Sequence, residues 1–116
     1  MNNTKIIPHV ATSYEVGAIL CDSWGYDQTN IDYYCIIARK GEWLTVQAMK
    51  KYSNPEAPQS MTTTEVPFGI DDSQKPLRKL LKIFNGEERG FSFRNYSGGG
   101  WCSLWNGKAK TASHYA

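Results

Sequence analysis

Residues 31–49, "IDYYCIIARKGEWLTVQAM", decide the fold class of this chain. Residues 31–39 and 42–49 are rich in β-branched and aromatic residues, and Lys40 and Gly41 separate the two segments. In the second segment, three apolar residues alternate with Trp43, Thr45 and Gln47, namely Leu44, Val46 and Ala48. Strand-like segments on either side of a short glycine turn predict a β-hairpin.

The preceding segment, "EVGAILCDSW" at residues 15–24, predicts another strand. Its apolar residues occupy both alternating sets of positions, which is typical of a strand buried on both faces. Residues 25–30, "GYDQTN", then join this strand to the hairpin and consist mainly of turn formers. We therefore expect a strand, loop and strand forming one corner of the fold.

Residues 52–76 contain four of the five prolines and a threonine-rich tract. Proline disfavours regular strands, so we predict a long irregular excursion over 52–75, with at most one short strand near Val66–Ile70. Long loops of this kind in small domains are often functional.

The segment "PLRKLLKIFNG", residues 76–86, fits two structures. Leu77, Leu81 and Phe84 are among the residues at helical spacing, whereas Lys79 and Ile83 belong to a strand-like alternation with Leu77 and Leu81. The hairpin-like "NGEERG" and "FSFRNY" that follow favour the strand. Residues 101–105, "WCSLW", predict a last short strand before a polar tail.

This inventory predicts a mainly β fold, a small curled antiparallel β-barrel of five to six strands that is SH3-like in its opening V-G-x-I-L pattern. Residues 75–85 form either a strand or one short helix. A chain of 116 residues is the size of one domain, so residues 1–116 are expected to fold as a single unit with a loose N-terminal arm over 1–13.

Composition points to a cytoplasmic protein without a metal or other cofactor. No apolar run approaches the roughly 18 residues of a membrane span, and the N-terminus has no apolar signal-peptide core. The three cysteines are odd in number and lack C-x-x-C spacing, so free buried thiols are expected at Cys21, Cys35 and Cys102. The two histidines lie near opposite ends of the chain.

The loop at residues 24–34 is the first candidate for a ligand-binding site. Aromatic faces and polar tips on a loop between two strands are a common way to bind a ligand. The alternative is structural, because Asp27 and Asn30 are also residues that cap turns. The candidate binding residues are Trp24, Tyr26, Asp27, Gln28, Thr29, Asn30 and Tyr34.

A basic and aromatic C-terminal third is the second candidate. Residues 75–116 carry eight Lys/Arg against two Asp/Glu, whereas residues 1–74 carry five against nine. Aromatic rings beside cations suit single-stranded nucleic acid, since bases stack and phosphates meet the charges. The alternative is a barrel core with solvated charges. The nucleic-acid candidates are Arg94, Tyr96, Trp101, Lys108 and Lys110.

Enzymatic motifs are sparse, and no catalytic residue is predicted. The glycine run "SGGGW" lacks the strand, loop and helix context of a phosphate loop. Asp22, Asp27 and Asp32 lie five residues apart, a spacing that matches neither a helical nor a strand face.

The stretches "VGAIL", "SWGYDQTNIDYY" and "SLWNGKAKTASHY" together resemble a family of small proteins encoded by bacteriophages and plasmids. In that family a V-G-D-I-L strand precedes W-G-Y-D-Q-T-N, and a W-D-G-K-P-like turn follows near the C-terminus. The resemblance covers residues 15–46 and 90–115, with Ala18, Asn106 and Ala109 departing from the pattern. It implies a mobile-element setting and residues 24–30 as the family's hallmark.

The expected function is therefore that of a non-enzymatic binding module of phage or mobile-element origin. Its ligand is not defined by these residues. Two alternatives are a protein that binds single-stranded nucleic acid and an inhibitor that contacts a host defence protein, because interface sites also favour Tyr, Trp and Arg.

Overall fold

The hairpin that the sequence predicts at residues 31–49 is present and lies in the middle of the sheet. The computed structural model describes residues 6–24, 30–55, 62–92, 101–108 and 110–113. In it, β2 (Asn30–Lys40) and β3 (Trp43–Pro55) pair antiparallel around Gly41, whose φ of 61° suits glycine. The other strands are β1 (Ile19–Trp24), β4 (Thr62–Ile70), β5 (Leu77–Leu80), β6 (Lys82–Phe84), β7 (Glu87–Ser92), β8 (Trp101–Leu104) and β9 (Lys110–Ser113).

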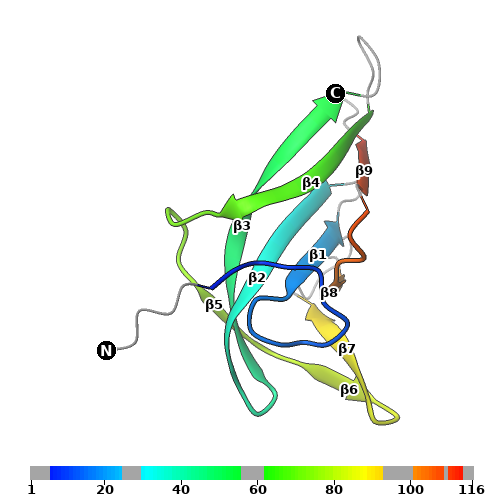
Figure 1. Cartoon of the computed structure of the whole chain (residues 1–116). Coiled ribbons are helices and arrows are strands. Elements are labelled where there is room, and N and C mark those ends of the chain that lie inside the picture. Colours follow the sequence, from blue (N-terminus) through cyan, green and yellow to red (C-terminus); the bar gives the residue numbers. More distant parts are fainter. Residues whose placement is uncertain (1–5, 25–29, 56–61, 93–100, 109, 114–116) are drawn as a thin grey trace.

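The nine strands form one curled antiparallel sheet (Figure 1). The order is β6-β7-β8-β1-β2-β3-β4-β9, and β5 pairs separately with β3. The mainly β class is confirmed, with more strands than the five to six expected. No ladder joins β6 to β9 among the residues that the structure describes, so a closed SH3-like barrel stays a prediction.

The irregular excursion predicted over 52–75 is wrong for residues 52–55 and 62–65, whereas the short strand allowed near Val66–Ile70 is present as part of β4. The long β3 continues to Pro55, and β4 runs antiparallel to it from Thr62, while residues 56–61 lie outside the described ranges. Pro67 lies inside β4 next to an irregularity, at which Phe68 and Gly69 of β4 oppose the single residue Lys50 of β3. Pro55 therefore marks the end of a strand, and Pro67 lies next to an irregularity within one.

Residues 77–84 form strands, not a helix. Two short strands, β5 and β6, flank Leu81, which is buried and donates its backbone N–H to the Glu42 carbonyl at 2.8 Å. Asn85 and Gly86, with φ of 52° and 77°, then turn the chain into β7. Positive φ at both central residues is typical of a two-residue hairpin turn.

The sheet buries side chains on both of its faces. One core cluster contains Leu20, Ile36 and Phe91, and the other contains Tyr33 and Trp105, whose rings meet edge to face with centroids 5.5 Å apart. Alternate residues of β1 and β2 enter the two clusters, which confirms that β1 is buried on both faces. No helix in the described ranges is long and apolar enough to cross a bilayer.

The three cysteines are free and buried, as predicted. Burial raises the pKa of Cys21 and of Cys35 to about 11, because it disfavours the thiolate. Burial also raises the pKa of Cys102, and the Asp22 carboxylate adds to this rise.

The N-terminal segment is tied to the sheet from residue 6 onward, which corrects the loose arm predicted over 1–13; residues 1–5 lie outside the described ranges. The His9 backbone N–H donates to Gly17 O at 2.8 Å, and the Ile19 N–H donates to His9 O at 3.0 Å. The His9 side chain contacts Glu15 through Nε2 at 2.8 Å. Gly17 is required at this point, because a Cβ there would lie 2.6 Å from the His9 ring.

Raising the pH is expected to loosen this attachment. Hydrogen bonds from the His9 ring to the Ile7 carbonyl and to Glu15 raise the pKa of His9 above its usual 6.5. A raised folded-state pKa means that the stabilisation is fully present below about pH 6.5 and is lost as the pH rises through the raised value. Urea unfolding at pH 5.5 and 8.5 checks this: the wild type should lose stability relative to the His9→Gln variant. Equal changes in both proteins would contradict it.

Candidate functional site

The 24–34 loop candidate lies at the end of the β1–β2 ladder. Trp24 and Asn30 are partners in register, the last residue of β1 and the first of β2. Tyr34 lies further along β2 opposite Leu20 and packs against the first core cluster, so packing accounts for it. The Trp24 side chain and residues Tyr26, Asp27, Gln28 and Thr29 lie outside the part of the chain that the structure describes.

Asp22 and Asp32 lie next to this corner. The five-residue spacing of Asp22, Asp27 and Asp32 did not indicate that the first and the last are neighbours across two strands. Asp22 and Asp32 are direct cross-strand partners because they are symmetric about the turn. Asp22 is fully buried, and it also lies opposite Cys102 of β8. Asp32 receives Lys51 Nζ at 3.3 Å. Counting outward from the predicted turn at 25–30 would have placed Asp32 opposite Ser23, whereas the ladder that starts at Trp24 and Asn30 pairs it with Asp22.

The Lys51 amine joins this corner to a buried acid of β4. Its Nζ lies 3.2 Å from a carboxylate oxygen of Glu65, a residue only 1% exposed. The Ser53 hydroxyl donates to the same carboxylate at 3.0 Å, and the Tyr33 hydroxyl donates to the Glu65 backbone carbonyl at 2.6 Å. The buried charge is therefore held by an ammonium ion and a hydroxyl donor.

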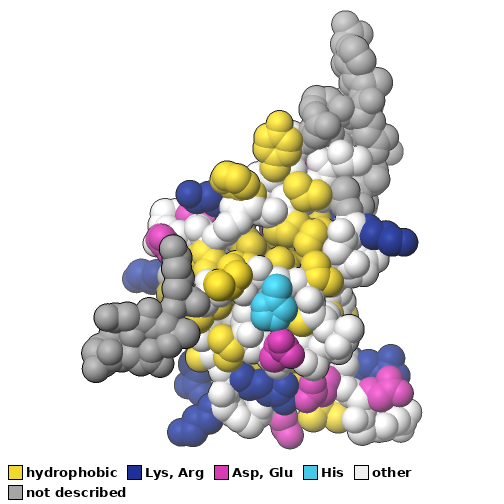
Figure 2. All heavy atoms as spheres, viewed as in Figure 1, with side chains coloured by type: hydrophobic (Ala, Val, Ile, Leu, Met, Phe, Trp, Pro, Cys, Tyr) yellow, Lys and Arg dark blue, Asp and Glu magenta, His cyan; other side chains and the backbone are white. Residues whose placement is uncertain are grey.

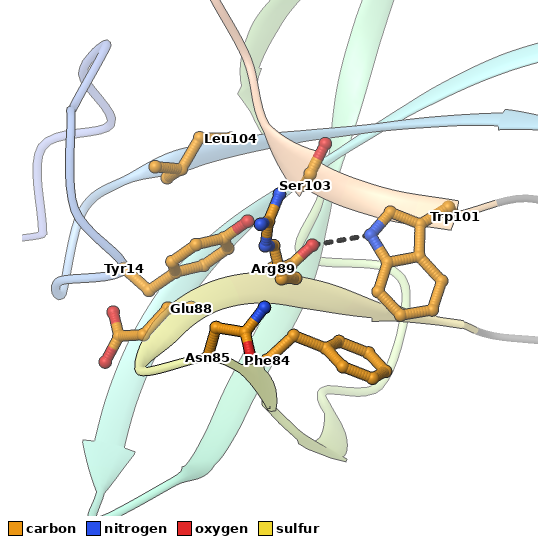
Figure 3. A pocket seen from close by; sticks show the side chains of 8 residues that line it. All are labelled: Tyr14, Phe84, Asn85, Glu88, Arg89, Trp101, Ser103 and Leu104. Atoms are coloured by element: carbon orange, nitrogen blue, oxygen red, sulfur yellow. Dashed lines mark hydrogen bonds between the residues drawn. The ribbon is translucent and has the colours of Figure 1, made fainter.

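A shallow groove of about 700 Å³ lies at the β6–β7 hairpin and β8 (Figure 3). Its lining combines aromatic, charged and hydroxyl-bearing side chains from segments far apart in the sequence. These are Tyr14, Phe84, Asn85, Glu88, Arg89, Trp101, Ser103 and Leu104. In Figure 2, charged side chains of both signs gather at the end of the molecule where Figure 1 draws this hairpin, while hydrophobic ones gather toward the opposite end.

The aromatic side of the groove is held by the backbone of β7. Trp101 donates its indole Nε1–H to the Arg89 carbonyl at 2.5 Å and remains 43% exposed. Gly90, with φ of 99°, brings β7 against β8, because any Cβ at that position would overlap the Cys102 carbonyl oxygen. Phe84, 62% exposed, precedes the Asn85–Gly86 turn. The groove thus presents two aromatic rings, one of them fixed by a hydrogen bond.

The polar side consists of a guanidinium and two hydroxyl groups. In Figure 3 the Arg89 side chain extends toward the Tyr14 hydroxyl and Ser103. Burial raises the pKa of Tyr14, and a hydrogen bond with the Leu104 backbone opposes the rise. Arg89 also forms an exposed ion pair with Glu87 at 3.1 Å.

Glu88 lies at the rim of the groove and is held by a different arginine. Arg39 contacts both oxygens of the Glu88 carboxylate, at 2.7 and 3.4 Å. The same guanidinium donates to the Tyr14 carbonyl at 2.8 Å. Arg39 therefore links β2, the N-terminal segment and β7 beneath the groove.

The residues predicted as one nucleic-acid surface are divided by the fold. Trp101 lies in the groove on β8, directly opposite Ser23 of β1 and hence beside the start of the 24–34 loop. Lys110 lies on β9, which pairs with β4. Lys108 is exposed and lies between β8 and β9 in the sequence. Arg94 and Tyr96 fall outside the described ranges. Reasoning from the sequence missed Tyr14, Phe84, Arg89 and Ser103, because their segments meet only through strand pairing.

A second, more apolar groove of about 540 Å³ lies where the N-terminal segment meets the sheet. Its lining is Ile6, Pro8, Ile37, Gln47, Gly69, Ile70 and Asp72. The Gln47 side chain already has partners within the protein, because its amide donates to the carbonyls of Asp71 and Gln74 at 2.8 and 2.5 Å. Ile6 and Ile70 also pack against the second core cluster, so this groove is continuous with the core.

The described residues contain no cluster of three or more His, Cys, Asp or Glu side chains able to hold a metal ion. Comparison of the chain with protein-family models, curated proteins and solved structures finds no match. The chemistry of the β7–β8 groove is therefore the basis for inferring a function.

Proposed function

We propose that this protein is a non-enzymatic binding module and that the β7–β8 groove holds single-stranded nucleic acid. The observation that carries the proposal is the Trp101 indole, fixed by its bond to Arg89 O with much of its surface open to solvent beside Arg89 and Phe84. Bases of any sequence stack on such rings, while guanidinium and ammonium groups meet the phosphates.

The charge around the groove supports this proposal. The exposed cation Lys82 belongs to β6, a strand of the hairpin at the groove, and residues 75–116 carry a net formal charge of +6. Such local charge favours association with a polyanion even when the whole chain carries only +2. The resemblance of residues 15–46 and 90–115 to phage- and plasmid-encoded proteins supports a mobile-element origin.

The state of the cysteines supports binding rather than covalent catalysis. A nucleophilic cysteine works as the thiolate, which a lowered pKa favours. Burial instead raises the pKa of Cys21 and Cys35 to about 11, and Cys102 shifts in the same direction.

Replacing Trp101 by Ala is expected to weaken binding of a fluorescent 12-nucleotide single strand by about 5- to 150-fold, since stacking of one base contributes about 1–3 kcal/mol. Fluorescence anisotropy at low ionic strength measures the affinity. Trp43→Ala is the matched control, because Trp43 is 45% exposed but lies on β3 under the Arg78 guanidinium, 4.9 Å from its ring centroid.

Trp101→Phe separates stacking from folding in the same assay. The phenyl ring keeps a stacking face but loses the hydrogen bond to Arg89 O, so affinity should lie between those of the wild type and Trp101→Ala. Equal affinity of all these proteins, or wild-type binding that ignores salt concentration, would exclude the groove as a nucleic-acid site.

A further inference from the structure

The polar end of the β7–β8 groove has the donors of an oxyanion site. The Arg89 guanidinium and the hydroxyl groups of Tyr14 and Ser103 line one wall of the same groove (Figure 3). A planar guanidinium presents paired N–H donors that match two oxygens of a phosphate. Two hydroxyl groups beside it can donate to the remaining oxygens.

The Tyr14 hydroxyl keeps its proton for such a contact. Tyr14 is 4% exposed, and burial raises the pKa of its phenol. Its hydrogen bond with the Leu104 backbone favours the phenolate and so places the phenol oxygen in the accepting role. The hydroxyl proton is then left to be donated to a ligand.

The two carboxylates near the groove, those of Glu87 and Glu88, contact different arginines. Glu88 is bound through both oxygens by Arg39, which neutralises it. Glu87 is paired with Arg89 itself, and both side chains are substantially exposed, at 67% and 49%. Exposed ion pairs of this kind are weak, so a phosphate that binds the guanidinium through two oxygens can replace Glu87.

We propose that Arg89, Tyr14 and Ser103 form a phosphate subsite, and that Glu87 occupies the Arg89 guanidinium until a ligand displaces it. This inference rests on the proposed function and assigns an orientation to it. The base of one nucleotide stacks on Trp101, and its phosphate lies at the Arg89 end of the groove. The recognised unit is a nucleotide phosphate, which either a strand or a free nucleotide can supply.

The sharpest consequence is that removing a carboxylate strengthens binding through one particular arginine. Glu87→Gln is expected to raise the affinity for the 12-nucleotide strand about threefold, because Arg89 is freed. Arg89→Gln is expected to lower it about tenfold and to reduce the slope of log affinity against log salt by about 0.7, the share of one phosphate contact on a single strand.

The double variant separates this competition from a general gain of positive charge. In the Arg89→Gln background, Glu87→Gln should no longer raise the affinity about threefold, because its target is absent. Asp72→Asn is the control for charge alone: it removes one negative charge from an exposed residue outside the β7–β8 groove and should leave the affinity unchanged. Thermal unfolding of each variant shows whether the fold is retained.

The outcomes distinguish the subsite from the proposed function. Strand binding that is unaffected by Arg89→Gln and Glu87→Gln overturns the subsite and leaves the nucleic-acid function standing. If no strand binds, NMR titration with a nucleoside 5′-monophosphate and with inorganic phosphate decides the rest. Chemical-shift changes that depend on Arg89 would support the subsite and identify a free nucleotide, rather than a strand, as its ligand. If neither probe causes a shift, both inferences are overturned.

Discussion

Gly90→Ala is expected to lower the free energy of unfolding by about 2–5 kcal/mol, since a positive φ costs an alanine about 1–2 kcal/mol and overpacking adds about 1–3. Gly90 has a φ of 99°, and a Cβ there would overlap the Cys102 carbonyl oxygen and lie 3.1 Å from Trp101 Nε1. The β7–β8 ladder would have to separate at Phe91, whose ring is in the core. Urea unfolding followed by tryptophan fluorescence measures the loss.

Gly86→Ala is the control for the backbone conformation alone. Gly86 also has a positive φ, 77°, but nothing lies within 4 Å of the position that its Cβ would take. Its replacement should cost only about 1–2 kcal/mol. If Gly90→Ala cost no more than Gly86→Ala, the close approach of β7 to β8 would not be a structural requirement. Nucleic-acid binding should also suffer in Gly90→Ala, because Trp101 and Arg89 lie on either side of that approach.

The second large effect is expected at the buried ion pair. Lys51→Met should lower the free energy of unfolding by about 3 kcal/mol, toward the low end for breaking a buried pair because Lys51 itself is one-third exposed. The variant removes an ammonium ion 3.2 Å from the carboxylate of Glu65, a side chain only 1% exposed. The same change removes the contact of Lys51 with Asp32. Chemical denaturation at pH 7 gives the difference.

Two further variants test this explanation. Lys50→Met removes the same charge from the neighbouring, exposed position of β3 and should change stability by less than about 0.5 kcal/mol. Combining Lys51→Met with Glu65→Gln should recover part of the loss, because the buried group is then neutral. A double variant less stable than Lys51→Met alone would show that the carboxylate is needed for its other contacts rather than for the ion pair.

The parts of the fold that the sequence predicts are those encoded by neighbours along the chain. The β2–β3 hairpin follows from alternation on both sides of Lys40–Gly41, and β1 follows from its apolar residues at every position. The decision between helix and strand at 77–84 could be made only because a hairpin-like sequence follows. In each case, side-chain period and turn chemistry act over a few residues and do not depend on distant contacts.

The parts that failed depend on what a strand pairs with. Thr62–Ile70 contains Pro67 and Gly69, and its sequence indicated at most a short strand near Val66–Ile70. The strand β4 starts earlier, at Thr62, because the second half of β3 offers an edge with which it pairs. Pro67 lies opposite Lys51, next to an irregularity at which Phe68 and Gly69 of β4 oppose the single residue Lys50 of β3. Propensity summed along β4 contains no information about which residues of β3 it pairs with.

The candidate site was predictable to a similar extent. Trp101 was identified because it is an aromatic residue within the basic C-terminal third. Its neighbours Tyr14 and Arg89 were missed, because they are brought to it by an N-terminal segment bound to β1 and by the β7–β8 ladder. Asp22 and Asp32 were noted, but their spacing was compared only with the faces of a single helix or strand. They are partners across the β1–β2 ladder.

The burial of the three thiols has a practical consequence for experiments on this protein. A thiol whose pKa is about 11, as for Cys21 and Cys35, is ionised in only about one molecule in ten thousand at pH 7, and maleimide dyes react with the ionised form. Cys102 is fully buried and therefore shielded from such reagents. A dye can thus be attached to a cysteine substituted for the exposed Lys40 without replacing any native cysteine, which gives a single-site label for following ligand binding at the β7–β8 groove.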